Sequence, residues 1–421
     1  MLFKESIKRF TPPKGWSWAS IGDVAKLSFS SVDKKSVEGE SAVSLCNYMD
    51  VFYNRRIREG MPFMVSTASD SDIKKFTLNK GDVVLTKDSE TPEEIAFAAV
   101  IDEQIENLVC GYHLAVLRPD KAKVTGEYLM SAINFHPNHH QFVRLANGAT
   151  RFGLGIDSLN NALLPLPPLA EQRKIAEILR TWDEAIETAE AELKAKQERK
   201  RVLMEKLLKP SAEDAVRGSK AKNGSENFLK SRVGEVAELK NGYAFKSQQY
   251  DVSGPYRVIT ISNVQEGRLD ATSCKFIKHA PDDLKQHHRL DVGDMLISMT
   301  GNVGRVCRVN ESGFLLNQRV GRIIPKNIDD GFFYYVLASE SFRDRMVELA
   351  QGGAQPNLSV GDILDYVFVH PASLQAQQMI AEILQVADAD IELINKRAED
   401  LRTQKRGLMQ KLLTGEVRVA A

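Results

Sequence analysis

The sequence has few cysteines, and they are spaced neither for a metal site nor for a disulfide framework. Cys46, Cys110, Cys274 and Cys307 lie far apart and form no Cys-x-x-Cys pair. Reduced, buried thiols are therefore expected, as in a cytoplasmic protein. The eight histidines add no ligand set at a spacing typical of zinc, so we expect the chain to bind no metal.

Long apolar runs are also missing. No segment approaches the roughly 20 apolar residues that span a bilayer. Residues 1–15 are polar and basic and lack the apolar core of a signal peptide. These two observations predict neither membrane insertion nor secretion, and hence a cytoplasmic location.

The chain has no excess of charge of either sign, with 56 Lys and Arg against 56 Asp and Glu. The balance is even along the sequence: residues 1–165 carry 19 basic and 20 acidic residues, and residues 229–370 carry 17 of each. DNA-binding domains are usually basic, because neutralising phosphates releases counterions. If this chain binds DNA, it must do so through local patches or together with a partner.

Common catalytic signatures are absent as well. The sequence contains no P-loop, no Gly-x-Gly-x-x-Gly opening a helix, no Gly-x-Ser-x-Gly and no His-Glu-x-x-His. It also lacks the Asn/Asp-Pro-Pro-Tyr/Phe signature with which adenine methyltransferases hold a flipped base. These absences argue against a self-contained restriction or methyl-transfer enzyme, and we expect a chain that is not an enzyme and binds no cofactor.

What the sequence does contain is an internal repeat. Leu169–Leu208 aligns without a gap with Leu374–Leu413, and 17 of the 40 positions are identical. The segments that precede the two repeats also resemble each other, but more weakly. An example is Ile21-Gly22-Asp23-Val24-Ala25, which resembles Val233-Gly234-Glu235-Val236-Ala237. The order along the chain is therefore module, helix, module, helix. The helices have stayed alike while the modules have diverged.

Each repeated stretch predicts one long helix. No Gly or Pro interrupts the first copy, good helix formers dominate it, and Pro167, Pro168 and Pro210 stand at its ends. Pro371 and Gly415 hold the corresponding places around the second copy. A helix of about 40 residues is about 60 Å long.

Apolar residues recur in both helices at alternating steps of three and four, which indicates that the copies pack on each other. Lys196, Lys200 and Lys405 interrupt these seams. They could set the local registry, but we favour the interpretation that their stems reach outward to water at the periphery. The residues expected to pack the helices together are Ile175, Leu179, Trp182, Ile186, Leu193, Ile380, Leu384, Ile391, Ile394 and Leu401.

The modules mix short strand-like runs with amphipathic segments, which predicts α+β domains rich in loops. Strands are expected at residues 82–86, 114–117, 257–261, 295–298 and 322–324, and helices at residues 126–134 and 331–349. The domain boundaries that follow are 1–165 for the first module, 166–209 for the first helix, 210–228 for a flexible connector, 229–370 for the second module and 371–415 for the second helix.

Both modules carry polar and basic residues at strand ends and in turns, where they could contact DNA. Arg, Asn and Gln can make bidentate hydrogen bonds to guanine or adenine, whereas Lys suits phosphates. For any single residue, a merely solvated side chain is the simpler alternative. The candidates are Asn47, Tyr48, Arg55, Arg56, Lys74, Lys75, Lys87, Ser89, Asn263, Thr300, Asn302, Arg305, Gln318, Arg319, Gln355 and Asn357.

Several motifs resemble those of the DNA specificity subunits of type I restriction–modification systems. Leu166-Pro167-Pro168-Leu169-x-Glu171-Gln172-x-x-Ile175-Ala176 is similar to the entry of their conserved helices. Trp16-x-Trp18-x-x-Ile21-Gly22-Asp23-Val24 resembles the start of their first target recognition domain, and Gly293-Asp294-x-Leu296-Ile297 and Leu316-Asn317-Gln318-Arg319 resemble segments of the second. The second helix entry departs from the pattern, with His370-Pro371-Ala372-Ser373-Leu374 in place of the double proline.

The resemblance implies two target recognition domains, joined and separated by an antiparallel coiled coil of the two long helices. Each domain would read one half of a split double-stranded DNA target, and the helices would set the spacing and dock two modification (methyltransferase) subunits. Those subunits would bind S-adenosylmethionine and methylate adenine. Two restriction (motor-nuclease) subunits would add cleavage where they are present, which the sequence leaves open.

A second hypothesis is a coiled-coil scaffold or adaptor whose modules bind protein partners. The zero net charge favours it, whereas loops rich in Asn, Gln and Arg favour DNA. Salt dependence separates the two, because a protein that contacts phosphates loses affinity steeply as salt rises.

Overall fold

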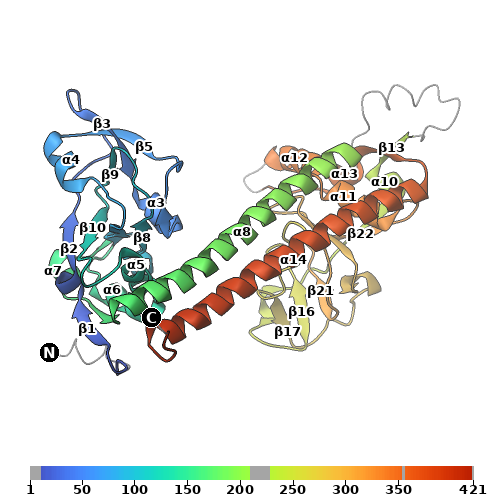
Figure 1. Ribbon diagram of the computed structural model, residues 1–421. Coiled ribbons are helices and arrows are strands. Elements are labelled where there is room, and N and C mark those ends of the chain that lie inside the picture. Colours follow the sequence, from blue (N-terminus) through green and yellow to red (C-terminus); the bar gives the residue numbers. More distant parts are fainter. Residues whose placement is uncertain (1–10, 209–227, 353–355, 420–421) are drawn as a thin grey trace. The chain divides into compact units, whose positions relative to one another are not determined.

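The chain folds into two compact units, each described here by itself from a computed structural model that places residues 11–208, 228–352 and 356–419. One unit contains the chain up to Ala189 together with the chain from Arg397 onward, and the other is Glu190–Lys396. Each unit consists of one α+β module and a half of each long helix (Figure 1). The α+β class with two long packed helices is thus confirmed. The connector expected at residues 210–228 lies outside the described residues, except for Phe228, which begins a strand.

The first module is built on a five-stranded sheet and a three-stranded sheet. The five strands, in sheet order, are β2 (Ala25–Phe29), β10 (Leu114–Pro119), β6 (Val83–Thr86), β8 (Ala98–Ile101) and β4 (Arg56–Ile57). The three strands are β5 (Met64–Ala68), β3 (Ser41–Cys46) and β9 (Leu108–Cys110), of which β3 and β9 run parallel. Two short pairs complete it: β1 (Ser17–Ser20) with β12 (Leu163–Leu166), and β7 (Asp88–Ser89) with β11 (Phe152–Gly153).

Short helices cover these sheets. They are α2 (Ile21–Val24), α3 (Tyr48–Tyr53), α4 (Asp70–Phe76), η1 (Pro92–Glu94), α5 (Gly126–Asn134), α6 (His136–Leu145) and α7 (Ile156–Asn160). The buried faces of α5 and α6 join the sheet and the start of the first long helix in one hydrophobic core.

The second module has a four-stranded and a five-stranded sheet. The first contains β14 (Ala237–Asn241), β22 (Val320–Pro325), β19 (Met295–Ser298) and β20 (Val306–Arg308). The second contains β15 (Tyr250–Asp251), β17 (Lys275–Ile277), β16 (Tyr256–Ile259), β21 (Phe314–Leu316) and β18 (Arg289–Leu290), with β16 and β21 parallel. A separate pair is β13 (Phe228–Arg232) with β23 (Val367–Pro371).

The helices of the second module differ in part from those of the first. They are α10 (Val233–Val236), η2 (Ser247–Gln249), η3 (Gln286–His288), α11 (Asp330–Leu337), α12 (Glu340–Leu349), η4 (Ala350–Gly352) and α13 (Val360–Leu364). The single helix expected at residues 331–349 is wrong, because the chain breaks between α11 and α12. Ser339 accepts a hydrogen bond from the amide of Phe342 and so caps a new helix. Similarly, the strand expected to reach Ile261 ends at Ile259, where the side chain of Asn263 caps the amide of Thr260 in a turn.

The two long helices have the bounds expected from the repeat: α8 (Leu169–Leu208) and α14 (Leu374–Leu413). The N-terminal half of α8 lies against the C-terminal part of α14 in the first unit, and the other two halves lie together in the second (Figure 1). The expected packing residues are buried or half-buried: Ile175, Leu179, Leu384 and Ile394 are buried, and Trp182, Ile186, Leu193, Ile380, Ile391 and Leu401 are half-buried.

Ion pairs across the helices show that they run antiparallel. Lys405 pairs with Asp183 in the first unit, while Lys200 pairs with Asp388 at 2.5 Å in the second. These pairs are repeat-equivalent, since Asp183 matches Asp388 and Lys200 matches Lys405 in the alignment. The favoured interpretation of seam lysines reaching outward is therefore wrong for Lys405, whose side chain is only 9% exposed. The opposing aspartates make registry the better account of these lysines.

A second repeated contact fastens each long helix to its module. The side-chain oxygen of Gln172 accepts from the amide of Thr125, which caps α5. Its counterpart Gln377 accepts from the amide of Asp329, which caps α11. Both glutamines are buried and also donate to a proline carbonyl at the helix entry. The same motif thus sets how α8 and α14 leave their modules.

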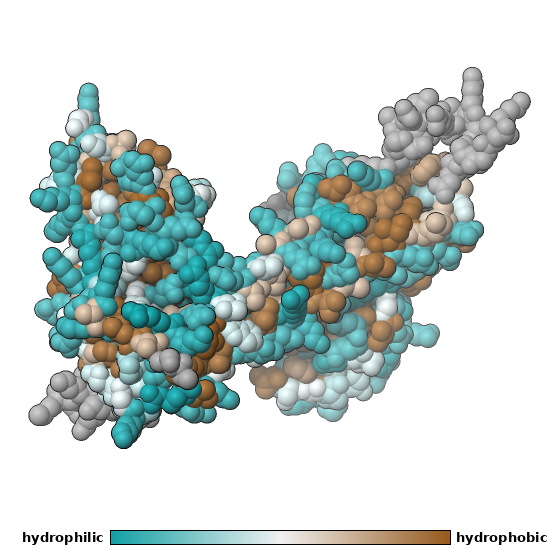
Figure 2. Space-filling view, viewed as in Figure 1, coloured by the Kyte–Doolittle hydropathy of each residue, from teal (hydrophilic) through white to brown (hydrophobic). Residues whose placement is uncertain are grey.

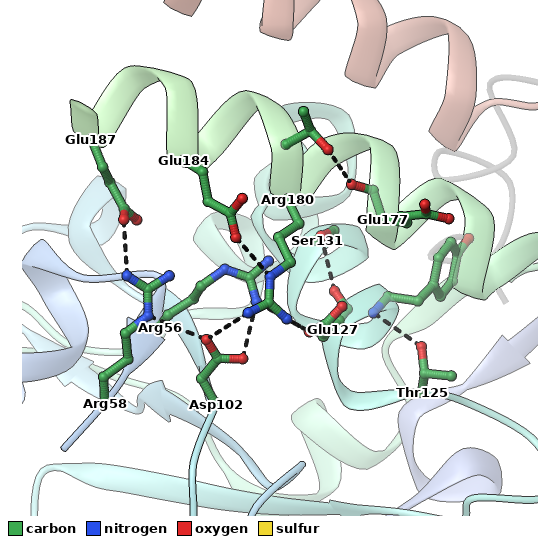
Figure 3. A network of polar contacts seen from close by, with 12 residues as sticks. Arg56, Arg58, Asp102, Thr125, Glu127, Ser131, Glu177, Arg180, Glu184 and Glu187 are labelled. Carbon is green, nitrogen blue, oxygen red and sulfur yellow. Dashed lines mark hydrogen bonds and ion pairs between the residues drawn. The ribbon is translucent and has the colours of Figure 1, made fainter. Parts of the chain in front are cut away.

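A cluster of ion pairs, in which Asp102 and Glu127 bind three arginines, further attaches α8 to the first module (Figure 3). The Asp102 carboxylate, 7% exposed, accepts from Arg56 at 3.4 Å, from Arg58 at 3.2 Å and from Arg180 of α8 at 3.3 Å. Glu127 accepts from Arg56 and Arg180 as well. Burial removes the water that would hydrate this carboxylate. Charge-assisted hydrogen bonds from three guanidinium groups replace the hydrogen bonds to water.

The four cysteines are free and buried, as expected, and burial raises the pKa of Cys46, Cys110 and Cys307. Hydrophilic side chains cover much of the face seen in Figure 2, with hydrophobic patches on each unit. Within the described residues, no helix is long and apolar enough to cross a membrane, and no three His, Cys, Asp or Glu residues cluster as metal ligands.

Candidate nucleic-acid interface

Each module carries an open hollow at its surface, at the ends of its central strands. The hollow of the second module measures about 480 Å³, and that of the first about 390 Å³. The second is lined by Asn241, Met299, Thr300, Gln318, Arg319, Asn357, Leu358, Ser359 and Val360. The first is lined by Lys34, Tyr48, Met49, Phe52, Tyr53, Asp88, Ser89, Glu90, Glu94, His113 and Arg151.

Three chain segments form the wall of the second hollow, and backbone hydrogen bonds hold them together. The amide of Met299, just after β19, donates to the carbonyl of Arg319 in the turn after β21, at 3.1 Å. The amide of Leu358 donates to the carbonyl of Met299 at 2.8 Å. Beside this contact, the hydroxyl of Thr300 donates to the side-chain oxygen of Asn357 at 2.7 Å. The turn needs Gly301, whose φ of +73° is strained for other residues.

The first module repeats this construction with different side chains. The amide of Lys87, just after β6, donates to the carbonyl of His113 at 3.1 Å, and the amide of Leu154 donates to the carbonyl of Lys87 at 2.8 Å. The pairing of β7 with β11 in the first module is equivalent to the β-bridge between Thr300 and Asn357 in the second. His113 therefore takes the place of Arg319, and Asp88 that of Thr300. The two hollows share one scaffold and differ in chemistry.

In the first hollow, basic side chains gather around one carboxylate. Asp88 pairs with Lys87 at 3.2 Å, with Nδ1 of His113 at 2.8 Å and with Arg151 at 3.7 Å. The ammonium of Lys87 also lies over the ring of Tyr112, 4.5 Å from its centroid. Burial and the nearby Glu94, Asp88 and Glu90 raise the pKa of Tyr48 to about 12, and its hydroxyl donates to the carbonyl of Glu94 at 3.3 Å.

In the second hollow, no Asp or Glu is among the described residues that line it. Its one cationic side chain, Arg319, is exposed and forms no ion pair within the part of the chain that the structure describes. The other polar lining groups are amides and hydroxyls. This hollow can therefore donate hydrogen bonds from a guanidinium and amides to acceptors on a ligand.

The structure brings some of the residues expected at the site together. Thr300, Gln318, Arg319 and Asn357 all line the second hollow. In the first, Tyr48 and Ser89 line the hollow, and Lys87 borders it through its pair with Asp88. Base contacts by these residues stay a prediction, but their common location is what a reading surface requires.

Three other candidates are engaged in the fold itself. Arg56 is buried and bound to Asp102 and Glu127. Asn263 is fully buried, where it accepts from the amide of Thr260 and donates to the carbonyl of Asp270. Arg305 donates to the side chain of Gln265 at 2.7 Å. Their strand-end positions reflect turn and core structure, so base contacts are not expected from Arg56 and Asn263 as they are placed.

The remaining candidates lie outside the lining of both hollows. Asn47 caps α3, and Arg55, Lys74, Lys75 and Asn302 are exposed. Gln355 lies outside the described residues.

Sequence reasoning missed His113 and Arg151, which line the first hollow, and Asn241, which lines the second. His113 holds the place of Arg319, because Leu316-Asn317-Gln318-Arg319 corresponds in the structure to Cys110-Gly111-Tyr112-His113. The amide of Asn317 donates to the carbonyl of Ile259, as the amide of Gly111 does to that of Cys46. The loops between the strands differ in length, so these residues align at another offset than the strands before them.

The long helices are repeated, and the two modules that they carry have diverged. Each module has a polar hollow at the same place. These features define a class of protein with two related but distinct binding domains. The family model for the "Type I restriction modification DNA specificity domain" matches residues 13–197 and again residues 225–403. The chain belongs to this family, and its modules are the DNA-recognition domains of a type I specificity subunit.

Individual relatives agree with this assignment. The chain is 30% identical over 273 residues to the specificity subunit of the type I restriction enzyme MjaVIII of Methanocaldococcus jannaschii. The aligned region covers 62% of this chain and 63% of that relative, which is less than two thirds of the relative's length. It is 23% identical over 326 residues to the EcoKI specificity subunit of Escherichia coli, with 73% of this chain and 68% of that one covered. The crystal structure of a type I S subunit from M. genitalium has the same fold, with a TM-score of 0.60 at 17% identity over 96% of this chain and 99% of that chain.

Proposed function

We propose that this chain recognises a two-part double-stranded DNA target, one part through each module, as the non-catalytic specificity subunit of a type I restriction–modification complex. The observation that carries the proposal is the pair of hollows: the same backbone construction presents Asp88 and His113 in one module and Thr300 and Arg319 in the other. A common scaffold with exchanged side chains suits two readers of two different half-sites.

The chemistry of the hollows supports reading of base edges. A carboxylate such as Asp88 can accept from the amino group of cytosine or adenine, and Arg and Gln side chains can donate to purine acceptors. Both sets lie on turns held by backbone hydrogen bonds, the usual arrangement for binding loops on a rigid scaffold. Lys74, Lys75 and Arg55, which are exposed, would suit phosphates.

On this proposal the long helices dock two methyltransferase subunits. Support comes from residues that are identical at equivalent positions of α8 and α14 and are exposed in both helices. Packing between the two helices does not explain why these residues are identical. They are Glu177 and Glu382, Glu187 and Glu392, Arg201 and Arg406, and Lys206 and Lys411. A surface that occurs twice in one chain suits two copies of one partner.

α14 also exposes an apolar row that a partner could cover. Met379, Val386 and Leu393 follow each other at steps of seven and are 58%, 65% and 68% exposed. Methyl transfer would then belong to the partner subunits, which would bind S-adenosylmethionine, while this chain would bind no cofactor. Two restriction subunits could complete the complex.

The scaffold hypothesis remains the alternative that the zero net charge favours. On the specificity-subunit proposal, the partner subunits supply much of the phosphate contact, so neutrality of this chain is no obstacle. The two proposals differ in how the assembled complex responds to salt.

The complex of this chain with its methyltransferase is expected to bind genomic DNA fragments with steep salt dependence. With 6–10 phosphate contacts, affinity should fall by about 10³–10⁵ between 50 and 200 mM salt. Filter binding across that range measures the slope, and the isolated chain serves as the control, which should bind poorly. A complex that fails to bind DNA at low salt, or nanomolar specific binding by the isolated chain, would count against this account.

A further inference from the structure

We propose that Arg319 reads a guanine, through the O6 and N7 acceptors of its major-groove edge, in the half-site recognised by the second module. The inference rests on the proposed function and names the base chemistry that one of the two hollows takes. A guanidinium offers two parallel N–H donors, and guanine is the base that presents two adjacent acceptors in the major groove.

The first support is the charge balance of the second module. Six of its arginines form ion pairs with carboxylates, and they are Arg232, Arg257, Arg308, Arg322, Arg343 and Arg345. Arg268, Arg289, Arg305 and Arg319 form none within the described residues, and of these four Arg319 is the one that lines the hollow, with amides and hydroxyls around it. Among the described residues, no carboxylate lines that hollow to compete with a ligand for the guanidinium.

The second support is the rigidity of the turn that presents Arg319. The amide of Gln318 donates to the carbonyl of Tyr243 at 2.9 Å, and the amide of Arg319 donates to the side-chain oxygen of Asn317 at 3.2 Å. The side-chain nitrogen of Asn317 donates in turn to the hydroxyl of Tyr250 at 3.0 Å. A Cβ on Gly242 would lie 2.3 Å from the carbonyl oxygen of Asn317, so the chain just after β14 packs directly on the turn. The backbone is fixed, while the side chains of Gln318 and Arg319 remain exposed.

Such an arrangement suits recognition, because ordering the backbone beforehand lowers the entropy lost on binding. The carbonyl of Arg319 also accepts from the amide of Met299, which fixes the backbone that carries this side chain at the wall of the hollow. Gln318, beside it, carries an amide that suits a neighbouring adenine.

The first module does not repeat this chemistry. His113 stands in the place of Arg319, and its Nδ1 is engaged by Asp88 at 2.8 Å. Loss of Arg319 should therefore change recognition in one half of the target and leave the other half as it is.

The test compares the wild-type complex with complexes that carry Arg319→Gln or Arg319→Lys. Each complex methylates a library of duplexes in which every base of the target is varied in turn, and long-read sequencing counts the methylated adenines. In the wild type, one position of the half-site read by the second module should require guanine. Both variants should tolerate other bases there, with discrimination reduced about 5- to 150-fold.

The lysine variant separates a base contact from a phosphate contact, because it keeps the charge but loses the two-pronged geometry. Arg345→Gln is the matched control, since Arg345 is paired with Glu348 on α12, away from the hollow, and its loss should leave the target unchanged. The inference is overturned if Arg319→Gln leaves every position as selective as before. It is equally overturned if methylation falls uniformly for all sequences and Arg319→Lys restores it. A wild-type complex that marks no two-part motif would instead refute the proposed function.

Discussion

Replacing Lys405 by methionine is expected to destabilise the first unit by about 3–5 kcal/mol, because the carboxylate of Asp183, which is largely shielded from water, loses the cation that is paired with it. The side chains of this pair are 9% and 13% exposed. Burial lowers the pKa of the Lys405 ammonium, and the adjacent Asp183 works against that shift. Neither group can readily recover its hydration when the other is removed.

The double variant Asp183→Leu/Lys405→Met should recover most of this loss, since apolar side chains of similar size avoid the desolvation cost altogether. The repeat-equivalent Lys200→Met is the matched control. Its pair is more open, at 22% and 39% exposure, and Asp388 keeps the hydroxyl of Tyr335 at 2.7 Å. Its cost should stay near the value of a surface pair, about 0–1 kcal/mol. Urea unfolding followed by circular dichroism measures all three; equal losses for Lys405→Met and Lys200→Met would contradict the burial argument.

The second large effect is expected at Asp102, where Asp102→Asn should cost about 3–5 kcal/mol. The substitution removes the charge that three arginines share and sets an amide donor against guanidinium donors. Arg56, with a side chain only 3% exposed, suffers most, because Glu127 is then its remaining anionic partner among the described residues. The attachment of α8 to the first module, drawn in Figure 3, should loosen as a result.

Glu184→Gln provides the control for this prediction. Glu184 binds the same Arg180 at 2.9 Å, but it lies 52% exposed on the surface of α8. Its loss should cost no more than about 0.5 kcal/mol, the value of a helical surface pair. Thermal unfolding measures the loss of stability in each of the two variants. Equal losses for Asp102→Asn and Glu184→Gln would show that the buried carboxylate does not hold the cluster together.

The long helices could be predicted to the residue because their signals are local. Proline stands at the entrances, and a heptad pattern continues through both copies. The role of Lys405 could not be derived in the same way, since the heptad shows that a lysine lies in the seam but not what faces it. The repeat did hold a clue: Asp183 and Lys200 recur as Asp388 and Lys405, and an antiparallel pairing joins each aspartate to the lysine of the other copy.

The modules were harder to derive from sequence, because their strands are short and pair over long distances. β4, β7 and β11 have two residues each, too few to show a periodicity, and they are defined by partners far along the chain. Four residues that line the second hollow, Thr300, Gln318, Arg319 and Asn357, were among the candidates from sequence, and Gln318 and Arg319 lie in the turn just beyond the buried strand β21. The lining of the first hollow was harder to predict, because His113 is separated from the Lys87 loop by a stretch whose length differs between the modules.

The most direct test of the central claim is methylation mapping of host DNA by long-read sequencing, with this chain present or deleted beside an active methyltransferase partner. The account predicts N6-methyladenine at a two-part motif with an unread gap of several base pairs, and loss of that mark when this chain is deleted. The same marks in both strains would contradict it and favour the scaffold hypothesis.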